Sequence, residues 1–371
     1  MQIRVKEGAI DLFVPKVEKI TSKNEVFYNP AQVINRDISV LLAACLLKKE
    51  SVVLDLLSAS GVRAIRFAKE VGMKNVYAND ANPAAVRLIK KNAKLNKVKL
   101  KISNLRAHEF LATRYKLKDK KFDYIDIDPF GTPVPFLDAA VKALNPRGGI
   151  LAVTATDTAA LCGSAPAACL RKYGAVPLRN ELMHEIGIRI LLKKIIEVGA
   201  QYDLALTPIF CHSTLHYVRV YLRAESGAKK ADEILKQVGM YKNAGPMWLG
   251  QLWDEKLTER MRKLARQSSY FSDVKKTTIK TFEKEFGLII NKNIIVSYET
   301  QKLLHTIKEE SKINSFGFYD LAIFMLKQVP KISDVIATLQ KKGFLAARTH
   351  FSPTGIRTNV TKEEFLKILK V

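Results

Sequence analysis

Short apolar runs alternate with amphipathic stretches along the first half of the chain. Residues 52–54 form a continuous apolar run, and a helical pattern follows from about Val62 to Glu70. The segment KNVYAND ends at Asp80, and NPAAVRLIKKNAKLN then begins a helix with Asn82 as its N-cap and proline as its first residue. Strands that alternate with helices of this length predict an α/β fold, in which helices cover both faces of a mostly parallel sheet.

The same alternation continues to about residue 156. FDYIDID predicts a strand, VPFLDAAVKAL predicts a helix, and GGILAVTAT predicts a further strand after a turn rich in proline and glycine. We therefore expect a Rossmann-like domain in this half of the chain. Ligands of such sheets bind at the carboxyl ends of the strands, so the residues that follow each predicted strand are candidates for a site.

The pattern changes in the second half of the chain. Residues 229–250 contain glycine and proline breaks, and we place a domain boundary there, with one domain over 1–235 and a second, α+β domain over 236–371. Residues 317–359 predict a helix, a short turn, a helix and a hairpin, an order that suits a winged-helix-like module. Near its wing lie three basic residues that we expect to bind RNA: Arg348, His350 and Arg357.

The charge balance indicates the kind of partner. The net charge is +25, from 61 Lys and Arg against 36 Asp and Glu. This excess predicts a polyanionic partner, with nucleic acid as the first candidate, and a basic surface kept for solubility as the alternative. No run of about 18 apolar residues occurs, and MQIRVKEGAIDLFVPK lacks the apolar core of a secretory signal. We expect a cytoplasmic protein with no membrane contact and no obligate protein partner.

Neither a metal site nor a disulfide is predicted. The chain has four cysteines, and none forms a C-x-x-C pair. Cys211, His212 and His216 could together hold a metal, but a strand with packed polar groups is the favoured interpretation. In the same segment Tyr217 and Arg219 alternate with valines, which is ordinary behaviour for a strand.

A cofactor pocket is predicted at the end of the first buried strand. Small residues follow this strand and would let a nucleotide approach the backbone, and Asp80 comes 19 positions after Gly61, where a carboxylate can bind ribose hydroxyls. A nicotinamide dinucleotide needs G-x-G-x-x-G, which is absent, so S-adenosylmethionine is favoured over the dinucleotide and over an ordinary turn. The predicted contacts in this region are Asp55, Ser58, Gly61, Arg63, Asp80 and Ala81.

The loop after the strand YIDID carries the candidate chemistry. Asp126 and Asp128 point to the same side of the strand, and D-x-D can also hold a divalent metal. However, DPFG is a one-residue variant of [D/N]-P-P-[F/Y], the signature of amine methylation. Asp128 and the carbonyl of Pro129 would accept the two N–H bonds of an exocyclic base amine, and Phe130 would stack on the flipped base. Asp126 remains unassigned.

Motifs along nearly the whole chain resemble one family, the tRNA (guanine-26) N2,N2-dimethyltransferases. They are VFYNPAQVINRDISV, DLLSASGVRAIRFAKE, YANDANPAAV, DIDPFGTPVPFLDAA, RNELMHEIGIRIL, HSTLHYVRVYLRAE, GPMWLG and RTHFSPTGIRTN. The resemblance implies a class I methyltransferase domain over 1–235 and a tRNA-binding domain over 236–371. It also implies one or two methyl transfers from S-adenosylmethionine to N2 of guanine 26.

The resemblance also implies residue roles. Arg36 and Arg66 would contact the cofactor, Asp80 its ribose, and Asp128 would be the catalytic acceptor. Phe27 would pair with Phe130 to sandwich the target guanine.

Two departures from the family pattern matter. Arg106 stands where many members carry an acid that meets the adenine, so Ala107 would serve through its backbone. The cysteines that some members carry before GPMWLG are absent, so no zinc is expected.

Two other functions stay open on the sequence alone. One is methylation of another exocyclic amine, in ribosomal RNA or another nucleic acid. The other is a non-catalytic RNA-binding protein that retains the fold. The number of methyl groups, the use of a neighbouring guanine, the selection of tRNA and the oligomeric state are not encoded in any motif.

Overall fold

The structure is a computed structural model that describes residues 2–16, 25–116, 120–270, 294–324 and 330–369. Its centre is a seven-stranded sheet in the order β5-β4-β3-β6-β7-β9-β8. The first five strands of this order are parallel, and β9 is antiparallel to both β7 and β8. The strands are β3 (Val52–Asp55), β4 (Asn75–Asn79), β5 (Lys101–Ser103), β6 (Tyr124–Ile127), β7 (Arg147–Ala155), β8 (Leu204–Thr214) and β9 (Tyr217–Ser226). The predicted α/β fold with a mostly parallel sheet is confirmed.

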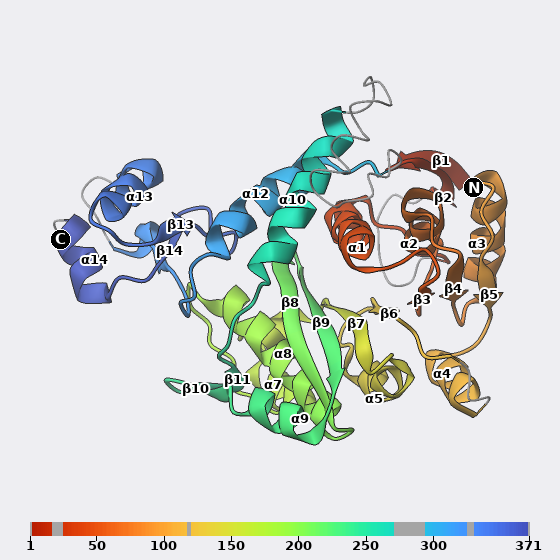
Figure 1. Ribbon diagram of the computed structural model, residues 1–371, viewed down its shortest axis with the longest axis horizontal. Coiled ribbons are helices and arrows are strands. Elements are labelled where there is room, and N and C mark those ends of the chain that lie inside the picture. Colours follow the sequence, from red (N-terminus) through yellow and green to blue (C-terminus); the bar gives the residue numbers. More distant parts are fainter. Residues whose placement is uncertain (1, 17–24, 117–119, 271–293, 325–329, 370–371) are drawn as a thin grey trace.

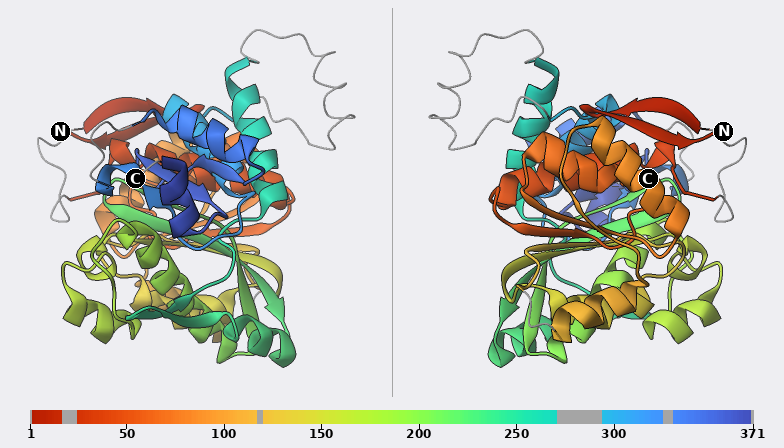
Figure 2. Two further views of the ribbon diagram at one scale, coloured as in Figure 1. Left: turned by 90° about the vertical axis from the view of Figure 1, so that its left-hand side faces the viewer. Right: turned by 90° about the vertical axis from the view of Figure 1, so that its right-hand side faces the viewer.

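Helices cover both faces of this sheet, as Figure 2 shows. One layer contains α1 (Val33–Leu46), α2 (Val62–Arg66) with its continuation η2 (Phe67–Val71), and α3 (Pro83–Leu95). The other layer contains α4 (Ala107–Lys116), α5 (Val134–Ala143) and α8 (Met183–Ala200). Shorter helices complete this part of the chain: η1 (Pro30–Gln32), α6 (Thr158–Leu161), α7 (Pro166–Tyr173) and α9 (Ala228–Leu235). Because both faces are covered, β3 and β6 are apolar and buried along nearly their whole length.

An N-terminal hairpin, which the sequence patterns did not predict, lies against the first helical layer. Its strands are β1 (Gln2–Glu7) and β2 (Ile10–Pro15). Alternate residues of β2 are buried and pack on Val62 and Ile65 of α2. The hairpin brings Glu7, at the end of β1, close to the arginines of α1 and α2.

The C-terminal part packs on α1 and α8 over residues 238–270 and 294–310 and extends away from the sheet only after them (Figure 1). It begins with β10 (Val238–Tyr241), β11 (Ala244–Trp248), α10 (Glu255–Tyr270) and α12 (Tyr298–Glu310). It ends with β12 (Tyr319–Asp320), η3 (Leu321–Ile323), α13 (Ile332–Lys341), β13 (Ala346–Arg348), β14 (Gly355–Thr358) and α14 (Lys362–Leu369). Where the first helix of 317–359 was predicted, Tyr319 and Asp320 instead pair with β14 as a strand, and only Leu321–Ile323 form a short helix. The rest of that predicted helix includes 325–329, which lie outside the described residues.

Apolar cores alone do not define domains, and the described residues form four of them, two of which hold most of the buried apolar side chains. The larger core contains residues from α1 through α12 and reaches Phe351. The smaller core contains Leu321, Val335, Leu339, Ile356 and Phe365, among others. The boundary at 235/236 and the winged-helix-like type of the second domain therefore stay predictions.

No helix in the described part of the chain is long and apolar enough to span a membrane.

Candidate active site

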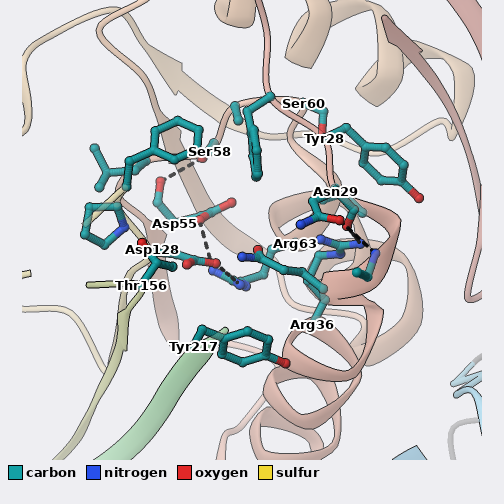
Figure 3. Close-up of a pocket in the computed structure, with 18 of the residues that line it drawn as sticks. Tyr28, Asn29, Arg36, Asp55, Ser58, Ser60, Arg63, Asp128, Thr156 and Tyr217 are labelled. Carbon is teal, nitrogen blue, oxygen red and sulfur yellow. Dashed lines mark hydrogen bonds and ion pairs between the residues drawn. The ribbon is translucent and has the colours of Figure 1, made fainter. Parts of the chain in front are cut away.

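A pocket of about 630 Å³ opens where β3, β4 and β6 end, at the edge predicted for a ligand. Figure 3 shows the carboxylates of Asp55 and Asp128 close to the guanidinium group of Arg63. The pocket brings together most of the predicted site residues: Phe27, Arg36, Asp55, Ser58, Arg63, Asp80, Asp128, Pro129 and Phe130. Residues missed by the sequence patterns also line it, among them Asn29, Thr156, Leu215, His216 and Tyr217.

The loop between β3 and α2 forms the side predicted for the cofactor. Asp80 accepts hydrogen bonds from the backbone N–H of Ala59 (2.8 Å) and of Asn82 (2.9 Å), so its carboxylate fixes both neighbouring loops. Gly61 adopts a φ of +78°, and a Cβ there would come within 3.1 Å of Ile89. The loop therefore needs glycine at this position, although Gly61 does not itself line the pocket.

Two arginines and three carboxylates form the pocket cluster, which consists of Asp55, Arg63, Asp126, Asp128 and Arg219. Arg63 donates to Asp126 and to Asp128 (2.7 Å), and Arg219 donates to the other oxygen of Asp126 (2.6 Å). Asp126, which the sequence left unassigned, thus lies between two guanidinium groups and has no exposed surface. It positions Arg63, which in turn positions Asp128.

The environment keeps Asp128 ionised. Burial alone would raise its pKa, but the charges of Arg63 and Arg219 outweigh this effect and hold the pKa of Asp128 below its usual value. Asn35 adds a longer contact to the same carboxylate oxygen, at 3.4 Å. Asp128 is therefore a hydrogen-bond acceptor at neutral pH.

The pKa of Asp55 is shifted in the opposite direction. Burial raises the pKa of Asp55 to about 7; Arg63 opposes this rise, and the charges of Asp126 and Asp128 add to it. Its carboxylate lies 3.9 Å from Arg63, too far for a direct hydrogen bond.

The loop Asp128–Gly131 is tied to the end of β7. The N–H of Gly131 donates to the hydroxyl of Thr156 (2.7 Å), and the N–H of Thr156 donates to the carbonyl of Gly131 (3.0 Å). Pro129 is buried, whereas Phe130 is 54% exposed. This arrangement holds the backbone of the loop while the aromatic ring points outward.

The two predicted stacking rings contact each other. The centroids of Phe27 and Phe130 are 4.5 Å apart, and their planes make an angle of 83°. A base stacked between two parallel rings needs them roughly 7 Å apart, because each layer takes about 3.5 Å. In this structure the rings close over the pocket edge to face, so a sandwiched base requires them to separate and turn.

A second set of two arginines and three carboxylates forms the N-terminal cluster, which consists of Glu7, Arg36, Asp37, Arg66 and Glu70. Arg36 lines the pocket and donates two hydrogen bonds of 2.6 Å to Glu7. Arg66 has no exposed surface, and its guanidinium group bonds with Asp37 (2.7 Å) and Glu70 (2.8 Å). The predicted cofactor contact of Arg66 is therefore wrong, because this side chain is enclosed by carboxylates and does not reach the pocket.

The residues predicted near the adenine are not part of the pocket lining. Ala81, Arg106 and Ala107 do not line the pocket. Arg106 is exposed, and its backbone N–H donates to Glu109 at the start of α4 (3.1 Å). Contacts of these three residues with a cofactor stay predictions.

Two of the three predicted RNA contacts are buried. Arg357 has no exposed surface and bonds with Glu185 of α8 (2.6 Å) and Glu310 of α12 (2.9 Å). The ring of His350 is also buried and bonds with Glu310 (2.7 Å). The predicted RNA contacts of Arg357 and His350 are wrong, because these side chains join the C-terminal part to the larger core. Arg348 is exposed, and its role in RNA binding stays a prediction.

Tyr217 and Arg219 are site residues that sequence reasoning assigned to ordinary strand structure. Arg219 neutralises Asp126, and Tyr217 lines the pocket beneath Arg63 (Figure 3). A signal existed for Arg219: an arginine in the apolar strand YVRVYL needs a buried carboxylate partner. Asn35 and Glu7 carried no such signal, because neither lies in an apolar strand, although Asn35 belongs to the motif VFYNPAQVINRDISV.

Within the described residues, no group of three or more His, Cys, Asp or Glu side chains could hold a metal ion. All four cysteines are buried as free thiols.

Comparisons with known proteins show which family this chain resembles. The family described as N2,N2-dimethylguanosine tRNA methyltransferase matches residues 8–244 and 239–370. The chain is 38% identical to the tRNA (guanine(26)-N(2)/guanine(27)-N(2))-dimethyltransferase of Aquifex aeolicus, with 98% of this chain and 94% of the relative covered. It is 37% identical to the tRNA (guanine(26)-N(2))-dimethyltransferase of Methanocaldococcus jannaschii, with 98% of each covered.

A solved structure agrees as well. Trm1 from Pyrococcus horikoshii, in complex with S-adenosyl-L-methionine, superposes with a TM-score of 0.82 at 35% identity, and 99% of each chain is covered. The resemblance stated from the motifs is thereby confirmed, and the chain belongs to the N2,N2-dimethylguanosine tRNA methyltransferase family.

Proposed function

We propose that this chain transfers methyl groups from S-adenosylmethionine to the exocyclic N2 of guanine 26 in tRNA. Family membership supports the reaction and the substrate class. The observation that carries the assignment to residues is the ionised Asp128, held by Arg63 at 2.7 Å in the loop that also contains Pro129 and Phe130.

The residues of the pocket fit the cofactor. The loop Ser58–Gly61 has only small side chains, and Asp80 presents a carboxylate at the end of β4 for ribose hydroxyls. When bound, S-adenosylmethionine supplies an electrophilic methyl group on its sulfonium. Asp80 would hold the ribose, and Arg36, Asp55 and Ser58 would surround the rest of the cofactor.

Asp128 and Pro129 would act on the guanine amine. The lone pair of N2 is delocalised into the base, so the amine is a poor nucleophile. The Asp128 carboxylate and the Pro129 carbonyl would accept its two N–H bonds, which localises the lone pair and aims it for in-line attack. Because its pKa is low, Asp128 orients the amine first; after transfer the cationic N2 is acidic enough to give its proton to Asp128 or to water.

Phe27 and Phe130 would hold the flipped base. The exposed ring of Phe130 gains a stacking partner when guanine enters, and the edge-to-face contact with Phe27 is exchanged for a stack on the base. Each base–aromatic stack is worth about 1–3 kcal/mol. The free energy of stacking on the base offsets the loss of the contact between the two rings.

Methylation of unmodified tRNA tests the proposal. Purified protein is incubated with the tRNA and labelled S-adenosylmethionine, and the digested nucleosides are analysed by mass spectrometry. We expect N2-methylguanosine at early times and N2,N2-dimethylguanosine later, mapped to position 26. A variant tRNA with adenine at 26 should lose the product, while label at 27 would extend the site to the neighbouring guanine. Label only in another base of the tRNA, or label in a parallel incubation with ribosomal RNA but none in tRNA, would contradict the proposal.

A further inference from the structure

The turn that joins β8 to β9 places two exposed side chains at the mouth of the pocket. Thr214 and Tyr217 form the last pair of the hairpin, so the turn consists only of Leu215 and His216. Both turn residues line the pocket, as does Phe130. Leu215 is 62% exposed, so a large apolar side chain faces solvent beside the site.

Leu215 has a backbone conformation that suits glycine. Its φ is +53°, in the left-handed region. Turns of two residues with positive φ favour glycine, asparagine or aspartate, because a Cβ crowds the neighbouring carbonyl. Leucine here strains the backbone and also exposes apolar surface to water. The backbone strain and the exposed apolar surface both occur beside the pocket. Strained residues are common at functional sites, so this place suggests a function for Leu215.

Residues of the C-terminal part form hydrogen bonds with the end of β8, just before the turn. The N–H of Ser213 donates to Nε2 of His350 (3.3 Å), and Nδ1 of the same ring contacts Glu310 (2.7 Å). Trp253 donates its indole N–H to the carbonyl of Cys211 (2.9 Å). These hydrogen bonds hold the end of the β8–β9 hairpin in place, so the position of Leu215 is fixed as well.

The proposed reaction gives such a side chain a use. A guanine in a stacked RNA helix must leave the stack to reach Asp128, and its departure opens a gap between the neighbouring bases. Proteins that disrupt base stacking commonly insert leucine, isoleucine, methionine or phenylalanine between the bases. An apolar side chain on a fixed turn, next to the pocket that receives the base, has the chemistry and the place for this role.

We propose that Leu215 is a substrate-positioning residue that enters the base stack of tRNA where the target guanine leaves it. This inference rests on the proposed function, because it requires tRNA and a flipped guanine. Leu215 holds the gap open, and Phe27 and Phe130 hold the base that has left it.

The substitution Leu215→Gly removes the wedge and keeps the turn, since glycine adopts the observed φ without strain. We expect kcat/KM for tRNA methylation to fall between about fivefold and about a hundredfold, because the variant no longer offsets the cost of unstacking one base step. Affinity for S-adenosylmethionine should not change, and the melting temperature should stay equal or rise. Leu215→Met should retain most of the activity. Leu170→Ala, at a 57% exposed leucine of α7, is the matched control and should be unaffected.

A fluorescent base separates positioning from structure. With 2-aminopurine at the position next to the target guanine, wild-type protein should raise the fluorescence as the guanine leaves its neighbour, and Leu215→Gly should not. A mismatched partner opposite the guanine lowers the cost of flipping and should restore much of the activity of Leu215→Gly. If Leu215→Gly methylates and flips like the wild type, the wedge is overturned while the proposed function stands. If the wild type methylates no tRNA, the proposed function itself fails.

Discussion

The pocket cluster and the N-terminal cluster have the same charge composition but different surroundings. Each contains two arginines and three carboxylates. Arg63 and Arg66 are one turn apart on α2, and each serves one cluster. In the N-terminal cluster the carboxylate side chains are at most 2% exposed, and one oxygen of Asp37 also accepts bonds from Ser297 and Thr300.

In the pocket cluster one carboxylate remains accessible. The side chain of Asp128 is 13% exposed and lies in the pocket lining. Both clusters have a member in the pocket lining, but only the pocket cluster has an accessible carboxylate there, and this carboxylate is the group that can act on a substrate. The other members keep that carboxylate ionised, as Arg63 and Arg219 do for Asp128.

The largest expected effect is on the exposed member of the pocket cluster. Asp128→Asn removes the ionised acceptor, and the rate of methyl transfer in single-turnover assays should fall by about 10²–10⁴-fold. Calorimetry should show S-adenosylmethionine still bound. Asp138→Asn, on the exposed face of α5, is the matched control and should keep the wild-type rate. A fully active Asp128→Asn variant would remove the distinction between the two clusters.

The substitution Arg66→Met, in the N-terminal cluster, should lower the stability of the fold. It leaves Asp37 and Glu70 without their guanidinium partner in a fully buried place, which costs about 3–5 kcal/mol of unfolding free energy. Denaturant unfolding measures the loss, and Arg66→Lys should recover part of it. At low temperature the folded fraction should keep wild-type affinity for S-adenosylmethionine. A stable variant with lost cofactor affinity would instead make Arg66 a ligand residue.

Phe27→Ala should weaken the use of tRNA by about 1–3 kcal/mol, the value of one stacked base. The effect should appear in kcat/KM for tRNA, with a smaller change in the affinity for S-adenosylmethionine measured by calorimetry. An equal loss in both quantities would place Phe27 on the cofactor instead of the base.

The last prediction concerns pH, where the effect is spread over several pH units and is small in each. The pKa of Asp55 is about 7 in the folded chain and lower when unfolded, so the folded state binds the proton more tightly. Its contribution to stability is full at acid pH and is lost as pH rises to about 7, by at most about 1.4 kcal/mol per pH unit. Asp55→Asn should flatten this part of the profile, measured by denaturant unfolding between pH 5 and 8. An unchanged slope would contradict the raised pKa.

Much of this could be predicted from local patterns. The strands that end at Asp55, Asn79 and Ile127 are short apolar runs, and their order places Asp80 and Asp128 at one edge of the sheet. Contacts between distant segments could not be predicted in this way. Arg66 and Arg357 are arginines in motifs, and only the fold shows that Glu7, Glu185 and Glu310 enclose them.

The contact between the two aromatic rings is another feature that the sequence could not predict. Motifs identify Phe27 and Phe130 as partners, but their mutual contact depends on packing and on the absence of a base between them. The β8–β9 turn shows another, because Leu215 has no sequence signal for a positive φ.

The buried Arg357 has an evolutionary consequence. Its guanidinium joins β14 to Glu185 of α8 and Glu310 of α12, while His350 supports the β8–β9 turn. A change that removed Arg357 alone would leave two buried carboxylates without this cation, and a change that removed Glu185 and Glu310 would bury the cation without a partner. The packing of the last strands on α8 and α12 therefore limits which substitutions at 185, 310 and 357 the fold tolerates one at a time.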